Sequence, residues 1–168
     1  VYIVDESGFP KKGEHSVGVA RQWCGVLGKV ANCQVGVFGA YVSRQGYTLV
    51  DRRLFLPEEW FDEDHRERWE KCGIPDETRF QTKPEIALQM LQAVVAHGGL
   101  RFRWVTCDEL YGRSTEFLDG VADLDRWYFA EVPQDTRVWE TRPETGIPEW
   151  SGRGPRPTKE RLLLGEPA

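Results

Sequence analysis

Short apolar segments separated by polar turns dominate the first two thirds of the chain, and they predict strands before helices. Residues 1–4 are apolar, mostly β-branched or aromatic, and lead directly into Asp5, Glu6 and a glycine turn. A bounded apolar run of this length is typical of a buried central strand. Residues 16–23 predict a short strand and residues 24–32 a connecting loop. Residues 33–42 and 47–56 form two more apolar runs around a three-residue loop, which predicts an antiparallel hairpin.

The pattern then changes to helical spacing and returns to strands. Thr82-Lys83-Pro84-Glu85 predicts a helix start with a capping box, and His97-Gly98 predicts its end. An apolar strand over 101–107 follows, then a helix near 115–124 and a strand over 127–132. A hairpin followed by β-α-β-α-β predicts an α/β fold, in which a mixed sheet of antiparallel hairpin strands and parallel strands is flanked by helices.

The last part of the chain lacks this periodicity. We expect residues 1–132 to form one domain and residues 133–168 to form a Pro-rich irregular tail. The tail holds six prolines and several basic residues, namely Pro133, Pro143, Pro148, Pro155, Pro157 and Pro167 with Arg153, Arg156, Lys159 and Arg161. Its basic residues suit either contacts to DNA phosphates or a disordered linker.

Composition narrows the class of protein. The net charge of −5 does not indicate general nucleic-acid binding, so any DNA contact must come from local basic patches. No apolar run is long enough to cross a membrane and no signal peptide is visible, so we expect a cytoplasmic protein without a membrane partner. The four cysteines show no CxxC spacing, which argues against a zinc site and favours reduced thiols.

Two aspartates carry the main functional clue. Asp5 and Asp108 each follow an apolar strand, and parallel neighbouring strands would bring them together. Paired carboxylates suit Mg²⁺, which takes oxygen ligands and supports phosphoryl transfer. On spacing alone, an aspartate that only caps a turn or helix is the commoner case. Glu6 and Glu109 should point to the opposite faces, as outer or exposed groups.

Several ordered motifs resemble the catalytic core of bacterial insertion-sequence transposases of the DDE superfamily, which have a ribonuclease-H-like fold. They are Val-Tyr-Ile-Val-Asp-Glu-Ser-Gly-Phe-Pro-Lys-Lys-Gly, Ser-Val-Gly-Val-Ala-Arg-Gln-Trp, Asn-Cys-Gln-Val-Gly-Val-Phe, Leu-Phe-Leu-Pro, Thr-Lys-Pro-Glu and Trp-Val-Thr-Cys-Asp-Glu-Leu-Tyr-Gly. Together they run from residue 1 to about residue 138.

The resemblance implies Mg²⁺-dependent DNA nicking at element ends, with Mn²⁺ as the alternative ion, and strand transfer through a 3′-hydroxyl. Asp5 and Asp108 match the first two acids of the catalytic triad, which bind the metal. The implied partner is double-stranded DNA, both transposon ends and target. A nucleoid-associated location and a homodimer are compatible with this resemblance.

The third acid of the family, a Glu within Tyr-x-x-Arg-x-x-x-Glu, has no match. Tyr41 and Arg44 fit the first half of the pattern, but Thr48 stands where the Glu belongs and the segment is a predicted strand. The late glutamates lie too early or in irregular chain; these are Glu131, Glu140, Glu144 and Glu149. We therefore expect a fragment that ends inside the insertion before the third acid and is inactive alone. The alternatives are a non-catalytic regulatory fragment that binds DNA or a transposase, and a ribonuclease-H-like nuclease that uses a late Glu.

Some polar side chains near the two acids are candidates for DNA binding. Each also has an ordinary structural explanation: a solvated turn, pairing along a strand edge, or packing against the sheet. These candidates are Lys11, Lys12, His15, Arg21, Tyr111 and Arg113.

Overall fold

The computed structural model describes residues 1–139 and 141–164. The chain divides into two units, Val1–Val132 and Pro133–Ala168. The first unit contains the sheet, the helices and both candidate aspartates, and the second contains a short two-stranded sheet.

The central strand, β1 (Tyr2–Pro10), is longer than the apolar run predicted. It continues past Asp5 because β3 (Lys29–Ser43) pairs with it antiparallel along its whole length, from Tyr2↔Tyr41 to Pro10↔Cys33. Gly8 therefore lies inside the strand and not in a turn. A Cβ at Gly8 would come within 2.9 Å of the Cys24 sulfur, so the glycine allows close packing.

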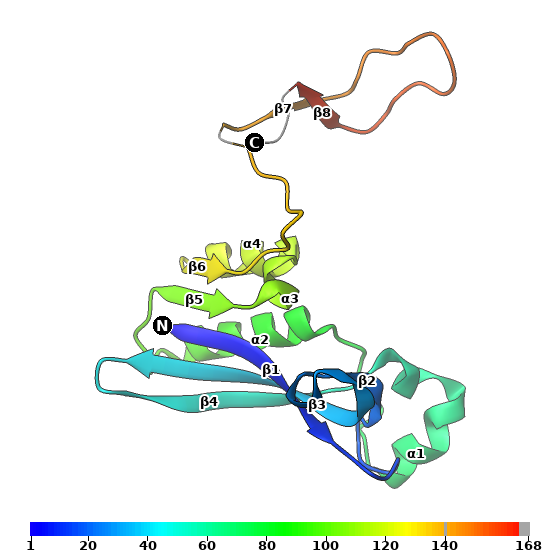
Figure 1. Cartoon of the computed structure of the whole chain (residues 1–168), viewed down its shortest axis with the longest axis vertical. Coiled ribbons are helices and arrows are strands. Elements are labelled where there is room, and N and C mark those ends of the chain that lie inside the picture. The colour runs from blue at the N-terminus through cyan, green and yellow to red at the C-terminus, as the bar shows by residue number, and fades with distance from the viewer. Residues whose placement is uncertain (140, 165–168) are drawn as a thin grey trace. The chain divides into compact units, whose positions relative to one another are not determined.

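The sheet has the predicted mixture of pairings. Its strand order is β2-β3-β1-β5-β6, and β4 pairs with β3. The antiparallel strands β2 (Ala20–Cys24) and β4 (Gly46–Phe55) pair with β3, whereas β5 (Trp104–Cys107) is parallel to β1 and β6 (Trp127–Ala130) is parallel to β5. The expected α/β ribonuclease-H-like class is confirmed (Figure 1).

The segment before and after β2 differs from the prediction. The expected strand over 16–23 begins only at Ala20, because residues 16–19 form a turn in which the Val19 amide donates to the Ser16 carbonyl at 3.0 Å. The expected loop over 24–32 is reduced to a 3₁₀ turn, η1 (Gly25–Leu27), after which β3 begins at Lys29. The hairpin β2–β3 is therefore tight and compact.

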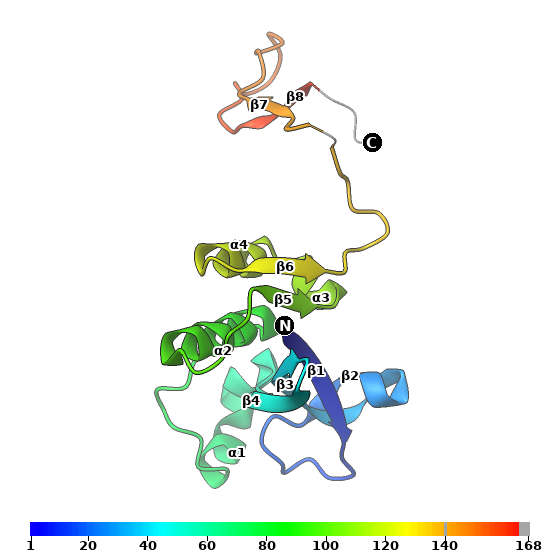
Figure 2. The ribbon, with the colours of Figure 1, turned by 90° about the vertical axis from the view of Figure 1, so that its left-hand side faces the viewer.

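Two helices, α2 (Lys83–His97) and α4 (Thr115–Asp123), pack against each other and cover one face of the sheet (Figure 2). Their apolar sides join the strands in one core, which includes Tyr2, Val4, Val37, Ile86, Met90, Leu91, Val105, Phe117 and Val121. The shorter helical segments are η2 (Glu58–Phe61), η3 (Glu63–His65), α1 (Arg66–Lys71) and α3 (Glu109–Gly112). None of the helices in the described residues is long and apolar enough to cross a membrane.

The start of α2 follows the predicted capping box. The Thr82 hydroxyl accepts from the Glu85 amide at 3.3 Å, and the Glu85 carboxylate accepts from the Thr82 amide at 2.7 Å. We expect Thr82→Ala to lower the free energy of unfolding by about 1 kcal/mol, because the Glu85 amide in the first turn of α2 loses the hydroxyl that accepts its hydrogen bond. Urea unfolding followed by tryptophan fluorescence measures the loss. Thr82→Ser keeps the hydroxyl and should unfold like the wild type; an equal loss in both variants would contradict the capping role.

The second unit is not wholly irregular. Within it, β7 (Glu144–Gly146) pairs antiparallel with β8 (Arg161–Leu164). Trp150 donates through Nε1 to the Gly154 carbonyl at 3.0 Å, and the Arg156 guanidinium lies over the Trp150 ring, 5.2 Å from its centroid. The expectation of an irregular tail is thus corrected for these two short strands. Glu140 and Pro167 lie outside the described residues.

Candidate functional site

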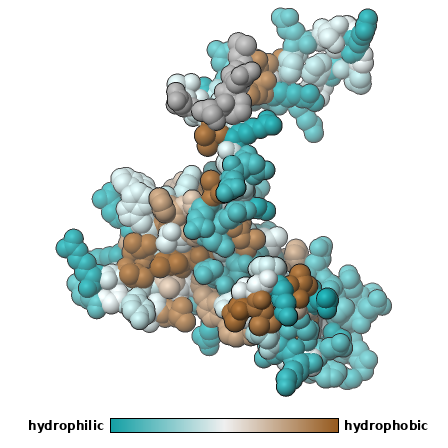
Figure 3. Space-filling view, viewed as in Figure 1, coloured by the Kyte–Doolittle hydropathy of each residue, from teal (hydrophilic) through white to brown (hydrophobic). Residues whose placement is uncertain are grey.

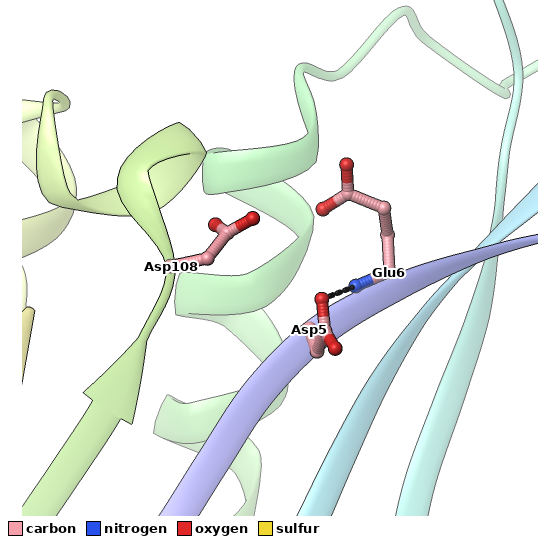
Figure 4. Close-up of side chains that lie close together, drawn as sticks. All are labelled: Asp5, Glu6 and Asp108. Carbon is pink, nitrogen blue, oxygen red and sulfur yellow. Dashed lines mark hydrogen bonds between the residues drawn. The ribbon is translucent and has the colours of Figure 1, made fainter. Parts of the chain in front are cut away.

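The two candidate aspartates meet where β5 ends. Val4 of β1 pairs with Cys107, the last residue of β5, and β1 then continues without a neighbour on that side. Asp5 and Glu6 occupy this free edge, and Asp108 leads from β5 into α3 (Figure 4). The parallel pairing of β1 and β5 therefore places the two predicted acids side by side.

The cluster contains three carboxylates. Asp5, Glu6 and Asp108 each offer one carboxylate oxygen, and these oxygens lie within 4.8 Å of one another. Asp5 is exposed, whereas Glu6 and Asp108 are partly buried. Carboxylate oxygens at such spacing form a ligand set suited to a hard divalent cation. It is the one cluster of this kind among the described residues.

Backbone amides orient both aspartates. One oxygen of Asp5 accepts from the Glu6 amide at 2.8 Å. One oxygen of Asp108 accepts from the Leu110 amide at 3.0 Å, so Asp108 also caps α3. The capping explanation considered from the sequence is therefore correct for Asp108. It does not exclude a metal, because the cap uses one of the two carboxylate oxygens.

Glu6 corrects the expectation from strand alternation. It was expected to face away from the site as an outer group, yet its carboxylate joins the cluster. Its Oε1 pairs with the Lys83 ammonium at 3.0 Å, and both side chains are at most 19% exposed. Its Oε2 is buried and has no hydrogen-bond partner among the described residues. The long Glu side chain reaches the site because β1 has no neighbouring strand there.

Glu109 behaves as predicted. It is about half exposed and forms an ion pair with Arg113 one helical turn later, outside the cluster. Arg113, a candidate for DNA binding, is itself exposed and already has this carboxylate as a partner.

The surroundings of Asp5 and Asp108 disfavour the ionised form of both carboxyl groups, and the pKa of each is raised. Partial burial of the Asp5 carboxyl raises its pKa, and the hydrogen bond from the Glu6 amide partly opposes this rise. Burial raises the pKa of Asp108 as well, and the negative charge of Glu6 adds to the rise. Burial, followed by the charge of Asp108, raises the pKa of the Cys107 thiol to about 11, so this thiol stays protonated at neutral pH.

These shifts predict a dependence of stability on pH. Because the pKa of Asp108 is higher in the folded chain, folding is penalised above that pKa, and the penalty disappears as the pH falls below the unfolded value near 3.8. Without metal, we expect Asp108→Asn to raise the free energy of unfolding at pH 7, and this gain to vanish near the unfolded pKa. Urea unfolding in the presence of a chelator, at pH 7 and near the unfolded pKa of 3.8, measures this difference in stability.

Asp119→Asn, which changes an exposed acid on α4, is the control for that experiment. A gain in stability that is the same at both pH values, or that also occurs in the Asp119 variant, would contradict the proposed cause.

Tyr111 lies in the core and not on a DNA-facing surface. Its side chain is fully buried, and its ring packs against Phe117 with centroids 5.6 Å apart. Burial, followed by the charges of Glu6, Asp108 and Asp5, holds the pKa of Tyr111 well above its usual value. A ring in this position cannot stack on a base without leaving the core, which corrects the DNA-binding expectation for Tyr111.

The other basic candidates lie on the surface, and β1 separates Lys11 from the acids. The side chains of Lys11, Lys12, His15 and Arg21 are exposed. Because β1 continues to Pro10, Lys11 lies six residues beyond Asp5, or about 20 Å along the strand. Asn32 brings two of these segments together: its side chain donates to the Lys11 carbonyl at 3.0 Å, and its backbone pairs with Arg21.

The late glutamates do not join the cluster in the described part of the chain. Glu131 follows β6, and its amide donates to the Cys107 carbonyl at 3.1 Å, while Glu144 and Glu149 belong to the second unit. Tyr41 and Thr48 are paired on the β3–β4 hairpin, which agrees with a strand there and not the helix of the family pattern.

Comparison with known proteins places the chain in a family. The family described as DDE superfamily endonuclease matches residues 1–168. A probable transposase for insertion sequence element IS701 from Microchaete diplosiphon is 31% identical over 135 residues, which is 79% of this chain. The chain spans 31% of the length of that relative. No solved structure matches the chain.

Proposed function

Because the chain belongs to the DDE superfamily endonuclease family, we propose that Asp5, Glu6 and Asp108 form the divalent-cation site of a transposase catalytic core. The observation that carries this proposal is the approach of the three carboxylates to within 4.8 Å at the free edge of β1. Asp5 and Asp108 are the proposed catalytic and metal-binding residues. Glu6 is added to them as a third carboxylate.

The donor set fits Mg²⁺, with Mn²⁺ as a substitute, because all three groups offer hard anionic oxygens. The raised pKa values of Asp5 and Asp108 support this fit, since a bound cation offsets the cost of holding these charges together. A cation held by these three carboxylates would supply activation of an attacking oxygen and stabilisation of the leaving oxygen in phosphoryl transfer.

The surrounding residues hold the carboxylates ready for a ligand. The cap at α3 fixes the direction of Asp108, and the Glu6 amide fixes Asp5. Lys83 pairs with Oε1 of Glu6, whereas the buried Oε2 has no hydrogen-bond partner among the described residues. The neutral thiol of Cys107 adds no further charge beside Asp108.

The proposed substrate is double-stranded DNA, first at transposon ends and then at the target. The reaction is nicking followed by strand transfer, and the exposed Lys11, Lys12, His15, Arg21 and Arg113 are the proposed phosphate contacts. We further propose that these 168 residues alone cleave DNA slowly or not at all, because they lack the third acid of the family pattern. A cytoplasmic, nucleoid-associated location and a homodimer belong to the same proposal.

Nicking of supercoiled plasmid in Mg²⁺ or Mn²⁺ tests this proposal. We expect the chain to bind the ion but to produce little nicked product above a chelator control. Strong nicking that is lost in Asp5→Asn and Asp108→Asn would show that the three carboxylates suffice and would contradict the proposed inactivity. If Glu131→Gln also abolished it, a nuclease with a late glutamate would be the better account. DNA binding without metal binding would favour a regulatory fragment.

A further inference from the structure

The cavity beside the acid cluster has an aromatic wall that the metal site does not use. This cavity, of about 270 Å³, is lined by the three carboxylates and also by Trp23, Gly25, Gly8 and Val35. The Trp23 side chain is 58% exposed, although a tryptophan gains more than most residues from burial. The indole therefore lines the same cavity as the three carboxylates.

The backbone holds Trp23 firmly beside the acids. It lies on β2 and pairs with Val30 of β3. The next residue, Cys24, is fully buried and packs against Gly8 of β1, where a Cβ would come within 2.9 Å of the Cys24 sulfur. The position of β2 relative to β1, and hence of Trp23 relative to Asp5 and Glu6, is therefore fixed by close packing.

Further exposed apolar residues surround Trp23 at the turn between β2 and β3. Val26, Leu27 and Val30 are 69%, 45% and 50% exposed, and we call them with Trp23 the hairpin tip. Figure 3 shows a brown patch over this part of the molecule. Single exposed apolar residues are ordinary, but a group of four beside a charged cavity is typical of a binding surface.

We propose that Trp23 stacks on an unpaired base of the nucleotide next to the phosphate held at the acid cluster, while the hairpin tip parts the neighbouring base step. The inference rests on the proposed function. The two walls of the cavity match the two halves of a nucleotide, because a cation on the carboxylates attracts the phosphate and the indole offers a flat apolar face to the base. Apolar side chains are used as wedges in this way.

The charge around the hairpin tip agrees with a nucleic-acid partner. Arg21 is exposed two residues before Trp23 on the same strand, and Lys29 is exposed at the start of β3. Successive side chains on one face of a strand are two residues apart, so Arg21 and Trp23 project on the same side. A neighbouring phosphate is the natural partner for Arg21 when a base covers Trp23.

Binding of two short duplexes of arbitrary sequence tests the inference. One is fully paired, and the other carries a single unpaired 2-aminopurine. We expect the wild-type chain, in Mn²⁺, to bind the second duplex about tenfold more tightly and to quench its fluorescence by stacking. Trp23→Ala should lose both the preference and the quenching, whereas Trp23→Phe should keep most of each.

Trp127→Ala is the matched control, because Trp127 is 55% exposed but lies on β6 and does not line the cavity. The inference is overturned if the wild type shows no preference for the unpaired base, or if Trp23→Ala and the wild type behave alike. A chain that binds Mn²⁺ but shows no preference would leave the proposed function standing. A preference that depends on Trp23 without Mn²⁺ binding would overturn the metal site alone.

Discussion

Asp108→Asn is expected to weaken Mn²⁺ binding about a hundredfold or more. Loss of groups that merely support metal ligands costs about 10–100-fold in affinity, and Asp108 is proposed as a direct ligand. The variant keeps the shape of the side chain and an oxygen that can still accept from the Leu110 amide, so α3 should stay capped. Isothermal titration calorimetry of the wild type and the variant measures the change.

Substitutions of the neighbouring acids should weaken Mn²⁺ binding to different degrees, according to where each carboxylate lies. Asp5→Asn should resemble Asp108→Asn, and Glu6→Gln should have a smaller effect, because one oxygen of Glu6 is already paired with Lys83. Asp119→Asn should bind like the wild type. The account fails on this point if Asp108→Asn binds Mn²⁺ with unchanged affinity, or if Asp119→Asn is equally weakened.

Gly112→Ala is expected to lower the free energy of unfolding by about 2–3 kcal/mol. Gly112 is buried at the end of α3, and a Cβ there would overlap the Glu131 carbonyl oxygen. This oxygen belongs to the backbone and cannot rotate away as a side chain would, so α3 or the end of β6 must shift. Because α3 begins after Asp108, the same shift should also reduce Mn²⁺ affinity. Urea unfolding and calorimetry report the two effects.

Gly13→Ala is the matched control for that substitution, because a Cβ at Gly13 meets no atom within 4 Å. It should leave both stability and Mn²⁺ affinity close to the wild-type values. A Gly112→Ala variant as stable as Gly13→Ala would contradict the close packing of α3 against the chain at the end of β6.

Local chemistry made much of the fold predictable. The capping box at Thr82 and Glu85 specified where α2 begins. The turn signal at residues 44–46 predicted the β3–β4 hairpin, although the turn is one residue shorter than predicted because Gly46 pairs with Ser43 as the first residue of β4. The approach of Asp5 to Asp108 follows from two apolar strands that each lead into an acid and lie parallel as neighbours. In each case the signal lies within a few residues and needs no knowledge of distant contacts.

Contacts between distant segments were not predictable. The length of β1 depends on its pairing with β3, and the packing of Cys24 against Gly8 depends on the path of β2. Strand alternation placed Glu6 on the wrong side of the strand. It could not show that β5 ends at Cys107, or that Lys83, 77 positions later in the chain, forms an ion pair with Glu6. The burial of Tyr111 likewise results from α4, whose Phe117 covers its ring.

A crystal of the chain soaked in Mn²⁺ and measured for anomalous scattering tests the central claim most directly. We expect an anomalous peak within direct coordination distance of carboxylate oxygens of both Asp5 and Asp108, with Glu6 facing the same ion. No peak at these carboxylates in crystals saturated with Mn²⁺, or a peak held only by other residues, would contradict it.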